Sequence, residues 1–314
     1  MRRKIFVGLI ILAIYLLGVI TPVPSRGEVK SNPTDTNQAT EQSKYNLLAK
    51  RIFIEDPNEP IIAFSPLRSQ MSQYFKDTQL SGSVYFEYLP TGTSIRVGTD
   101  ERRVAASLIK LPFAMEAYYA KEKGLIDFSK EYTLTQDMLN SEFGELYKRG
   151  AGTKLSLKEA IEVMLKDSDN TALNVVAKAV EGVVKPEEDP FNFLDAEFVQ
   201  NEDFTVSLTP RAYSSFIKCL YFSCYLDKAD SQEVLNLLTQ SHLRDRLPAG
   251  IPKDTVVANK VGNFYDNVQS DCGIVYVPKR NYLICVMIDG PDTNETSAHI
   301  AYLSKLAYDY VANY

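Results

Sequence analysis

The chain has 314 residues, of which 45% are hydrophobic and 24% charged, and its formal net charge is −6 at pH 7. This composition is ordinary for a packed protein, and the part that follows the N-terminal segment is long enough for one large α/β domain, which we expect to be a monomer. Because an acidic surface repels phosphates and no basic stripe is interleaved with aromatic residues, we expect no nucleic-acid partner.

The N-terminus is predicted to be a targeting segment. Arg2, Arg3 and Lys4 precede an uncharged run from residue 5 to residue 20, which fits a signal peptide or a short membrane anchor with its positive end inside. No convincing cleavage site follows, which favours the anchor slightly. We expect residues 1–22 to be this signal peptide or signal anchor in the membrane, residues 23–59 to be a flexible stalk, and residues 60–314 to be an exported, extracytoplasmic domain at the cell envelope.

Hydrophobic periodicity and turn residues predict the elements of this domain in chain order. A helix at 66–76 leads to strands at 83–88 and 94–98, which the turn Pro90-Thr91-Gly92 joins into a hairpin. Helices follow at 107–123, 156–166, 171–181, 210–227 and 231–240. Strands at 255–261, 271–277 and 282–288 precede a last helix at 299–312. These elements predict an α/β (α+β) fold, with a five-stranded antiparallel sheet flanked by helices and a second, all-helical lobe.

Ser107 and Lys110 place a hydroxyl and an amine three residues apart in an apolar stretch. If Ser107 opens a helix, this spacing puts both groups on one face. Burial of the lysine lowers its pKa, so the amine can accept the serine proton near neutral pH. Such a tetrapeptide alone is usually an N-cap followed by a solvated lysine, so the assignment depends on further motifs.

Two further motifs follow in order, Ser168-Asp169-Asn170 and Lys260-Val261-Gly262. Alone, the first is usually a turn or an N-cap. Together, the three motifs resemble the S-x-x-K, S-D-N and K-T-G signatures of class A β-lactamases and penicillin-binding proteins. From about Phe64 to the C-terminus, the chain therefore resembles a class A β-lactamase-like serine hydrolase, with the active site between its two lobes.

The resemblance implies a role for each motif residue. Ser107 would attack the amide carbonyl of a β-lactam or of a cell-wall peptide ending in D-alanine, with Lys110 as its base. Ser168 would pass a proton to the departing nitrogen, and Lys260 would supply positive potential to Ser168 and to the substrate carboxylate.

The resemblance also implies the substrate contacts around the nucleophile. Asn170 would hold the substrate and Lys110, and Gly262 would lie on the strand along the cleft edge. The backbone N–H groups of Ser107 and Asn263 would form the oxyanion hole, whereas Asp169 would cap backbone amides of its loop.

Two departures from the family pattern affect the predicted chemistry. Val261 stands where a Thr or Ser hydroxyl would bind the substrate carboxylate, unless Asn263 or Tyr265 supplies the missing donor. The Glu-x-x-Leu-Asn motif, whose carboxylate activates the deacylating water, is also missing. The most similar segment places Glu197 four residues before Asn201, and we expect Glu197 to be either this base or a solvated loop acid.

The cysteines and histidines predict no further chemistry. Cys219 and Cys224 lie in a predicted helix and Cys272 and Cys285 in neighbouring predicted strands, so we expect four structural core cysteines without an evident disulfide. The only histidines, His242 and His299, have no cluster of acidic residues around them. We therefore expect no metal site and no cofactor.

Three functions remain open from the sequence. The leading hypothesis is a β-lactamase-like hydrolase that opens β-lactam or acyl-D-alanine amides through an acyl-enzyme on Ser107. The alternative is a penicillin-binding peptidase or acyltransferase that acts on cell-wall stem peptides and releases its acyl group slowly. A non-catalytic envelope protein with this fold is the third hypothesis, against which the complete set of motif residues argues.

Overall fold

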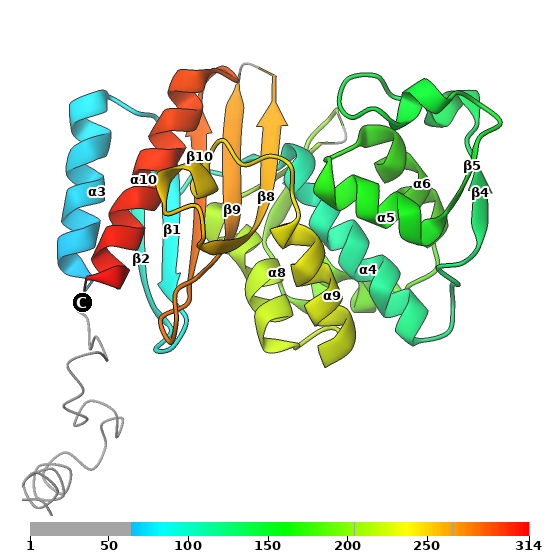
Figure 1. Ribbon diagram of the computed structural model, residues 1–314, viewed down its shortest axis with the longest axis horizontal. Helices are drawn as coiled ribbons and strands as arrows, with labels where there is room; N and C mark the ends of the chain where they lie inside the picture. The colour runs from blue at the N-terminus through cyan, green and yellow to red at the C-terminus, as the bar shows by residue number, and fades with distance from the viewer. Residues whose placement is uncertain (1–63, 204, 266, 314) are drawn as a thin grey trace, which may run out of the picture. The chain divides into compact units, whose positions relative to one another are not determined.

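A five-stranded antiparallel sheet forms the centre of the computed structural model, which describes residues 64–203, 205–265 and 267–313 (Figure 1). The strands are arranged in the order β2-β1-β10-β9-β8, and each pairs antiparallel with its neighbours. Their bounds are β1 (Gly82–Tyr88), β2 (Thr93–Gly98), β8 (Val256–Phe264), β9 (Val268–Tyr276) and β10 (Tyr282–Asp289). The predicted sheet and fold class are thus confirmed.

Helices cover both faces of the sheet, and some of them form a separate lobe beside it (Figure 1). On one face, α3 packs against α10, whereas α8 packs against β1, β9 and β10 on the other. The lobe contains α4, α5, α6 and α9. The helix bounds are α3 (Ser65–Thr78), α4 (Lys110–Glu122), α5 (Leu157–Lys166), α6 (Asn170–Val180), α7 (Pro190–Phe193), α8 (Pro210–Phe222), α9 (Lys228–Thr239) and α10 (Asn294–Ala312).

The alternation of side chains along the strands divides the hydrophobic core into two clusters. Phe86 and Ile284 point to the cluster beneath α3 and α10, whereas Tyr85 and Leu283 point to the cluster shared with α8 and the helical lobe. Successive side chains of a strand point to opposite faces of the sheet. The sequence of a strand that is covered on both faces is therefore continuously apolar, as in β10.

Short strands form two further small sheets. β3 (Arg103–Val104), β7 (Val206–Leu208) and β6 (Phe198–Gln200) form a small sheet in the order β3-β7-β6, and β4 (Glu131–Thr133) pairs with β5 (Lys154–Ser156). The first of these sheets joins β3, which precedes α4, to β6 and β7, which follow α7. Ala105 extends it, because its N–H donates to the carbonyl of Val206 at 2.7 Å.

Several predicted helix boundaries differ from the structure by one to five residues, and three of the differences have a clear local cause. The segment from Ser107 begins as a 3₁₀ turn, η2 (Ala106–Ile109), and becomes α-helical only at Lys110. The helix predicted to reach Asp227 ends at Phe222, because Ser223 adopts a left-handed conformation with φ 53°. The last helix begins at Asn294 rather than at residue 299, since the Thr293 side chain caps its N-terminus.

The expectation of unpaired core cysteines is wrong, because all four cysteines are disulfide-bonded. Cys219 and Cys224 pair across the end of α8, where the left-handed turn brings their Cα atoms to 5.1 Å. Cys272 and Cys285 are direct cross-strand neighbours on β9 and β10.

The predicted N-terminal segments lie outside the described residues. The boundaries at residues 22 and 59 therefore remain predictions, as does the membrane segment. Within the described part of the chain, no helix has the length and apolar character needed to cross a membrane.

Candidate active site

Ser107 lies in η2, at the entrance to α4, and two backbone features hold it there. The preceding Ala106 has φ 48°, a conformation that L-residues adopt at a cost and that is frequent at functional sites. Ala105 is tied to the small sheet through Val206, and the N–H of Leu108 donates to the Ala105 carbonyl at 2.9 Å. The nucleophile candidate is thus held in a turn anchored at both ends.

Lys110 is fully buried, and its amine lies among the polar groups of two motifs. Its Nζ is 2.8 Å from Ser107 Oγ, 2.7 Å from Asn170 Oδ1 and 2.5 Å from the Ser168 carbonyl oxygen. Burial lowers the pKa of Lys110 to about 7, although the Asp169 carboxylate opposes this shift. Near neutral pH, a substantial fraction of Lys110 is therefore the neutral amine, which can accept the Ser107 proton.

Ser168 lies between the two lysines of the site. Its backbone is left-handed, with φ 57°, and the following Asp169 caps α6 by accepting a hydrogen bond from the N–H of Ala172 at 2.8 Å. The second Asp169 oxygen accepts the N–H of Leu146, so this carboxylate fixes the loop as predicted. Asn170, the first residue of α6, projects its amide toward Lys110.

Lys260 approaches Ser168 from the opposite side, on strand β8. Its Nζ is 2.7 Å from Ser168 Oγ, whereas Lys110 Nζ is 3.3 Å from the same oxygen. Burial lowers the pKa of Lys260 well below its usual value, and the neighbouring Lys110 lowers it further. The hydroxyl of Ser168 thus connects two amines whose charged forms are both disfavoured.

Gly262 allows β8 to lie directly against η2. A Cβ built on Gly262 would be 2.8 Å from the carbonyl oxygen of Ala105 and 2.9 Å from Cγ of Leu108. These two residues flank the nucleophile turn, so the absence of a side chain at Gly262 sets the distance between β8 and Ser107. Contact with the substrate is a role that the resemblance alone assigns to this residue.

The three motifs open into one cavity of about 510 Å³. Ser107, Lys110, Ser168 and Asn170 line it together with Val261 and Asn263 from β8. Lys260 and Gly262 lie immediately behind, within β8. The structure therefore brings together all the predicted site residues of the three motifs and Asn263, and leaves the oxyanion role of the Asn263 N–H a prediction.

A buried arginine and an aspartate, which the sequence analysis missed, hold the β8 wall of this cavity. Arg246 is 1% exposed and donates to the carbonyl oxygens of Gly262 and Ser270, to Gln269 Oε1 and to Asp292 Oδ1. Asp292 lines the cavity and accepts a hydrogen bond from Asn263 Nδ2 at 2.6 Å. No local signal in the sequence connects Arg246 with Asp292.

Glu197 does not line the cavity that contains Ser107, so of its two predicted roles the solvated loop acid fits the structure better than the water-activating base. Its side chain is 80% exposed and forms an ion pair with Arg102 at 3.0 Å beside a different cavity. The reason is that strand β6 separates Glu197 from Asn201. Four residues of extended chain span about 13 Å, so only the Asn201 end reaches Thr205, which does line the Ser107 cavity.

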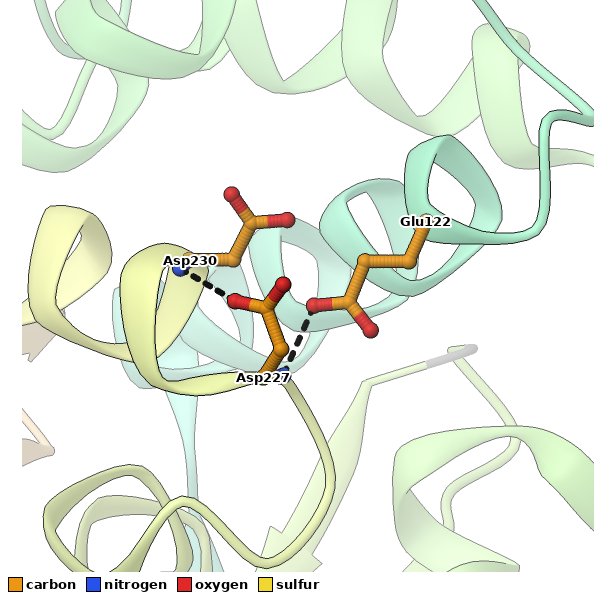
Figure 2. A group of neighbouring side chains, drawn as sticks. All are labelled: Glu122, Asp227 and Asp230. Carbon is orange, nitrogen blue, oxygen red and sulfur yellow. Dashed lines mark hydrogen bonds between the residues drawn. The ribbon is translucent and has the colours of Figure 1, made fainter. Parts of the chain in front are cut away.

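Three carboxylates outside this cavity come close enough to suggest a cation site, and Figure 2 shows how they lie. Glu122 accepts the N–H of Asp227, which in turn accepts the N–H of Asp230, both at 2.8 Å. Lys121 Nζ is 2.5 Å from Asp230 Oδ1 and supplies the counter-charge. These contacts are those of a helix cap, since Asp227 is the N-cap of α9.

Comparison with known proteins agrees with this geometry. The model of the β-lactamase enzyme family, Beta-lactamase2, matches residues 66–311. β-Lactamase VEB-1 of Pseudomonas aeruginosa is 21% identical over 245 residues, which cover 70% of this chain and 82% of that protein.

Solved structures share the fold at similarly low identity. The structure of PBP-A is 24% identical, has a TM-score of 0.73, and aligns over 82% of this chain and 99% of its own. A mutant of PBP-A, solved as an acyl-enzyme complex with penicillin G, has the same identity and TM-score and aligns over 82% of this chain and 100% of its own. Because the family model spans most of the described residues and the fold agrees, this chain belongs to the β-lactamase enzyme family and is a serine β-lactamase-like hydrolase.

Proposed function

We propose that this protein cleaves amide bonds of β-lactams or acyl-D-alanine compounds through an acyl-enzyme on Ser107. The Ser107 Oγ forms a bond to the carbonyl carbon while Lys110 Nζ takes its proton, which gives a tetrahedral oxyanion. The backbone N–H groups of Ser107 and Asn263 would stabilise that oxyanion. The observation that carries the proposal is the 2.8 Å contact between a fully buried Lys110 Nζ and Ser107 Oγ.

Collapse of the oxyanion breaks the carbon–nitrogen bond, and the departing nitrogen needs a proton. Ser168 donates its hydroxyl proton to this nitrogen and recovers one from the protonated Lys110, whose Nζ is 3.3 Å away. Lys260, at 2.7 Å, holds the Ser168 oxygen in position. The products of this half-reaction are an ester on Ser107 and a free amine, or a ring-opened amine where the substrate is a β-lactam.

Intact mass spectrometry with a chromogenic cephalosporin and with a monocyclic β-lactam that carries no anionic group tests the proposal. We expect an adduct whose mass matches the acyl group, located on the peptide containing Ser107, and its loss in Ser107→Ala. An adduct that persists in Ser107→Ala, or neither an adduct nor hydrolysis with either compound, would overturn the proposed chemistry.

A second candidate function differs only in the release step. Water must hydrolyse the ester to complete turnover, and a class A β-lactamase uses a carboxylate to activate it. Here Glu197 is bound to Arg102, and the cavity-lining Glu142 and Asp292 are bound to Tyr265 and Asn263. These pairings favour a penicillin-binding acyl enzyme or acyltransferase with slow release. A lifetime of minutes or longer for the Ser107 adduct would select this candidate, and rapid multiple turnover would select the hydrolase.

Export to the cell envelope is part of the proposal. The basic and apolar N-terminal sequence supports it, and so do the two disulfides, since such bonds persist mainly in oxidising compartments. We propose that residues 1–22 target or anchor the chain at the membrane and that a monomeric catalytic domain acts outside. Fractionation of cells that express the full chain, with N-terminal sequencing of the product, tests this location.

A further inference from the structure

The cavity wall beside β8 is where the family resemblance places the substrate carboxylate, and its chemistry here is unusual. Val261 occupies the position of the expected hydroxyl and lines the cavity with an apolar side chain. It can donate no hydrogen bond through that side chain. A carboxylate placed beside it would lose one of the donors on which its binding depends.

The two positively charged residues behind this wall, Arg246 and Lys260, already form hydrogen bonds within the protein. Arg246 is buried, and its terminal nitrogens donate to two backbone carbonyls, to Gln269 and to Asp292. Lys260 is 1% exposed, and its Nζ contacts Ser168 Oγ at 2.7 Å and the Val261 carbonyl oxygen at 3.1 Å. Burial also lowers its pKa well below the usual value, which weakens the positive potential that the resemblance assigns to it.

The side-chain donors that line this wall are already bound to carboxylates: the Tyr265 hydroxyl donates to Glu142 Oε1 at 3.2 Å, and Asn263 Nδ2 donates to Asp292. Asp292 is an anion, and its Oδ2 fixes Asn263 by accepting a hydrogen bond from Nδ2 at 2.6 Å. That contact assigns the amide orientation, because a carboxylate needs the donor end of the amide. The buried Oδ1 of Asn263 is then left with no partner among the described residues. The Asp292 carboxylate, which also pairs with Arg246 at 2.9 Å, can accept a hydrogen bond from an N–H group and offers none to a substrate carboxylate.

We infer that the group of the substrate that lies against Val261, Asn263 and Asp292 is an uncharged N–H donor, such as a carboxamide or a continuing peptide amide, rather than a free carboxylate. This inference rests on the proposed acylation of Ser107 and specifies the substrate class for it. Such a site would differ in specificity from one that binds the free C-terminal carboxylate of a D-alanyl peptide.

Three forms of one penicillin test the inference: the free acid, the methyl ester and the primary carboxamide. The second-order rate constant for adduct formation on Ser107 is measured for each by quenched-flow and intact mass. We expect the carboxamide to react at least tenfold faster than the acid, with the ester between them, because the ester removes the charge without adding a donor. An acid that reacts as fast as the carboxamide, or faster, would overturn the inference.

Two variants connect the preference with the wall. Val261→Thr supplies the missing hydroxyl and should reduce the carboxamide-to-acid ratio at least threefold, whereas the matched control Val261→Ala should leave the ratio within twofold. Asp292→Asn removes the negative charge and should also reduce the ratio. Ratios that none of these variants changes would contradict the assignment to this wall, and thermal unfolding of each variant verifies that it is folded.

The proposed function and this inference fail in different ways. If none of the three penicillins forms an adduct on Ser107 or is hydrolysed, the acylation chemistry itself is refuted. If all three acylate Ser107 and the acid reacts fastest, the acylation stands and only the substrate class is wrong.

Discussion

Replacement of Gly262 by alanine should displace the nucleophile without touching it. The new Cβ would lie 2.6 Å from Ser270 Oγ, 2.8 Å from the Ala105 carbonyl oxygen and 2.9 Å from Leu108 Cγ. All three distances are below 3.0 Å, and Cβ atoms in folded proteins essentially never approach another heavy atom so closely. Ser270 Oγ can rotate away, but the Ala105 carbonyl is backbone and belongs to the turn that holds Ser107, so we expect that turn to move.

The loss of stability and of acylation rate in Gly262→Ala follows from the contacts with the Ala105 carbonyl oxygen and Leu108 Cγ, which cannot move away easily. Overpacking a well-packed site costs about 1–3 kcal/mol, which we expect to appear in the free energy of unfolding. A displacement of about 1 Å at a reacting group can lower a rate by about 100-fold. Gly262→Ala should therefore acylate Ser107 about 100-fold more slowly while it remains folded.

Gly273→Ala is the matched control for this experiment. It lies in the same sheet, and its Cβ would be equally crowded, at 2.5 Å from the carbonyl oxygen of Ala258 and 2.8 Å from Cβ of Asn259, but it does not contact the Ser107 turn. Urea unfolding gives the stability of both variants, and the rate of adduct formation is compared per folded molecule. If Gly273→Ala loses as much acylation as Gly262→Ala at equal stability, the effect is general and the reasoning about the turn is refuted.

Three further predictions follow from the site and the core. The acylation rate should rise tenfold per pH unit below about pH 7 and then level off, because the lowered pKa of Lys110 makes its neutral form accumulate above that pH; a rate that is already maximal at pH 5 would exclude Lys110 as the base. Glu197→Gln should leave the lifetime of the acyl-enzyme within twofold of wild type, since this exposed side chain pairs with Arg102; an adduct that persists at least tenfold longer would restore Glu197 as the base. Titration with a thiol reagent under denaturing conditions should find no free cysteine. The double variant Cys272→Ala/Cys285→Ala should lose about 3 kcal/mol of unfolding free energy in urea, because the disulfide closes a loop with a sequence separation of 13. A loss below about 1 kcal/mol would contradict this estimate.

The sequence predicted the sheet and the three motifs because their signals are local. Alternating and β-branched runs identify strands, and a Ser-x-x-Lys pair on one helical turn shares a face whatever surrounds it. Strand β8 nevertheless extends to Phe264, beyond the predicted end at residue 261, because pairing of Phe264 with Val268 continues the hairpin. That extension depends on the partner strand, which no local pattern contains.

The missed disulfide shows how a small error in register hides a contact. Strands predicted at 271–277 and 282–288 with a four-residue turn would place Val277 opposite Tyr282, and Cys272 opposite Met287. The structure instead pairs Val275 with Tyr282, which brings Cys272 opposite Cys285. The register of a hairpin is set by its turn geometry, and the composition of this turn did not reveal its length.

The Arg246–Asp292–Asn263 contacts could not be predicted for a different reason. Asp292 precedes α10, whereas Arg246 precedes β8, and the folded sheet alone brings the two together, with 2.9 Å between Nη2 and Oδ1. A buried arginine is rarely expected unless its partners are known. The same absence of a local signal applies to Glu197, whose distance from Ser107 depends on whether the chain after α6 is helical or extended.

The features that make the site reactive are also those that cost stability, and they are concentrated at two turns. Ala106 and Ser168 both have left-handed backbones, each at a cost of about 1–3 kcal/mol, and each lies directly beside a buried lysine amine or its hydroxyl partner. Ser168 Oγ lies between the two lysine amines, and Lys110 disfavours the charged form of Lys260. When Lys110 takes the Ser107 proton, the pair gains a charge that burial opposes, and passing a proton through Ser168 to the leaving nitrogen relieves it. The same desolvation therefore opposes the first proton transfer, from Ser107 to Lys110, and favours the second, from Lys110 through Ser168 to the leaving nitrogen.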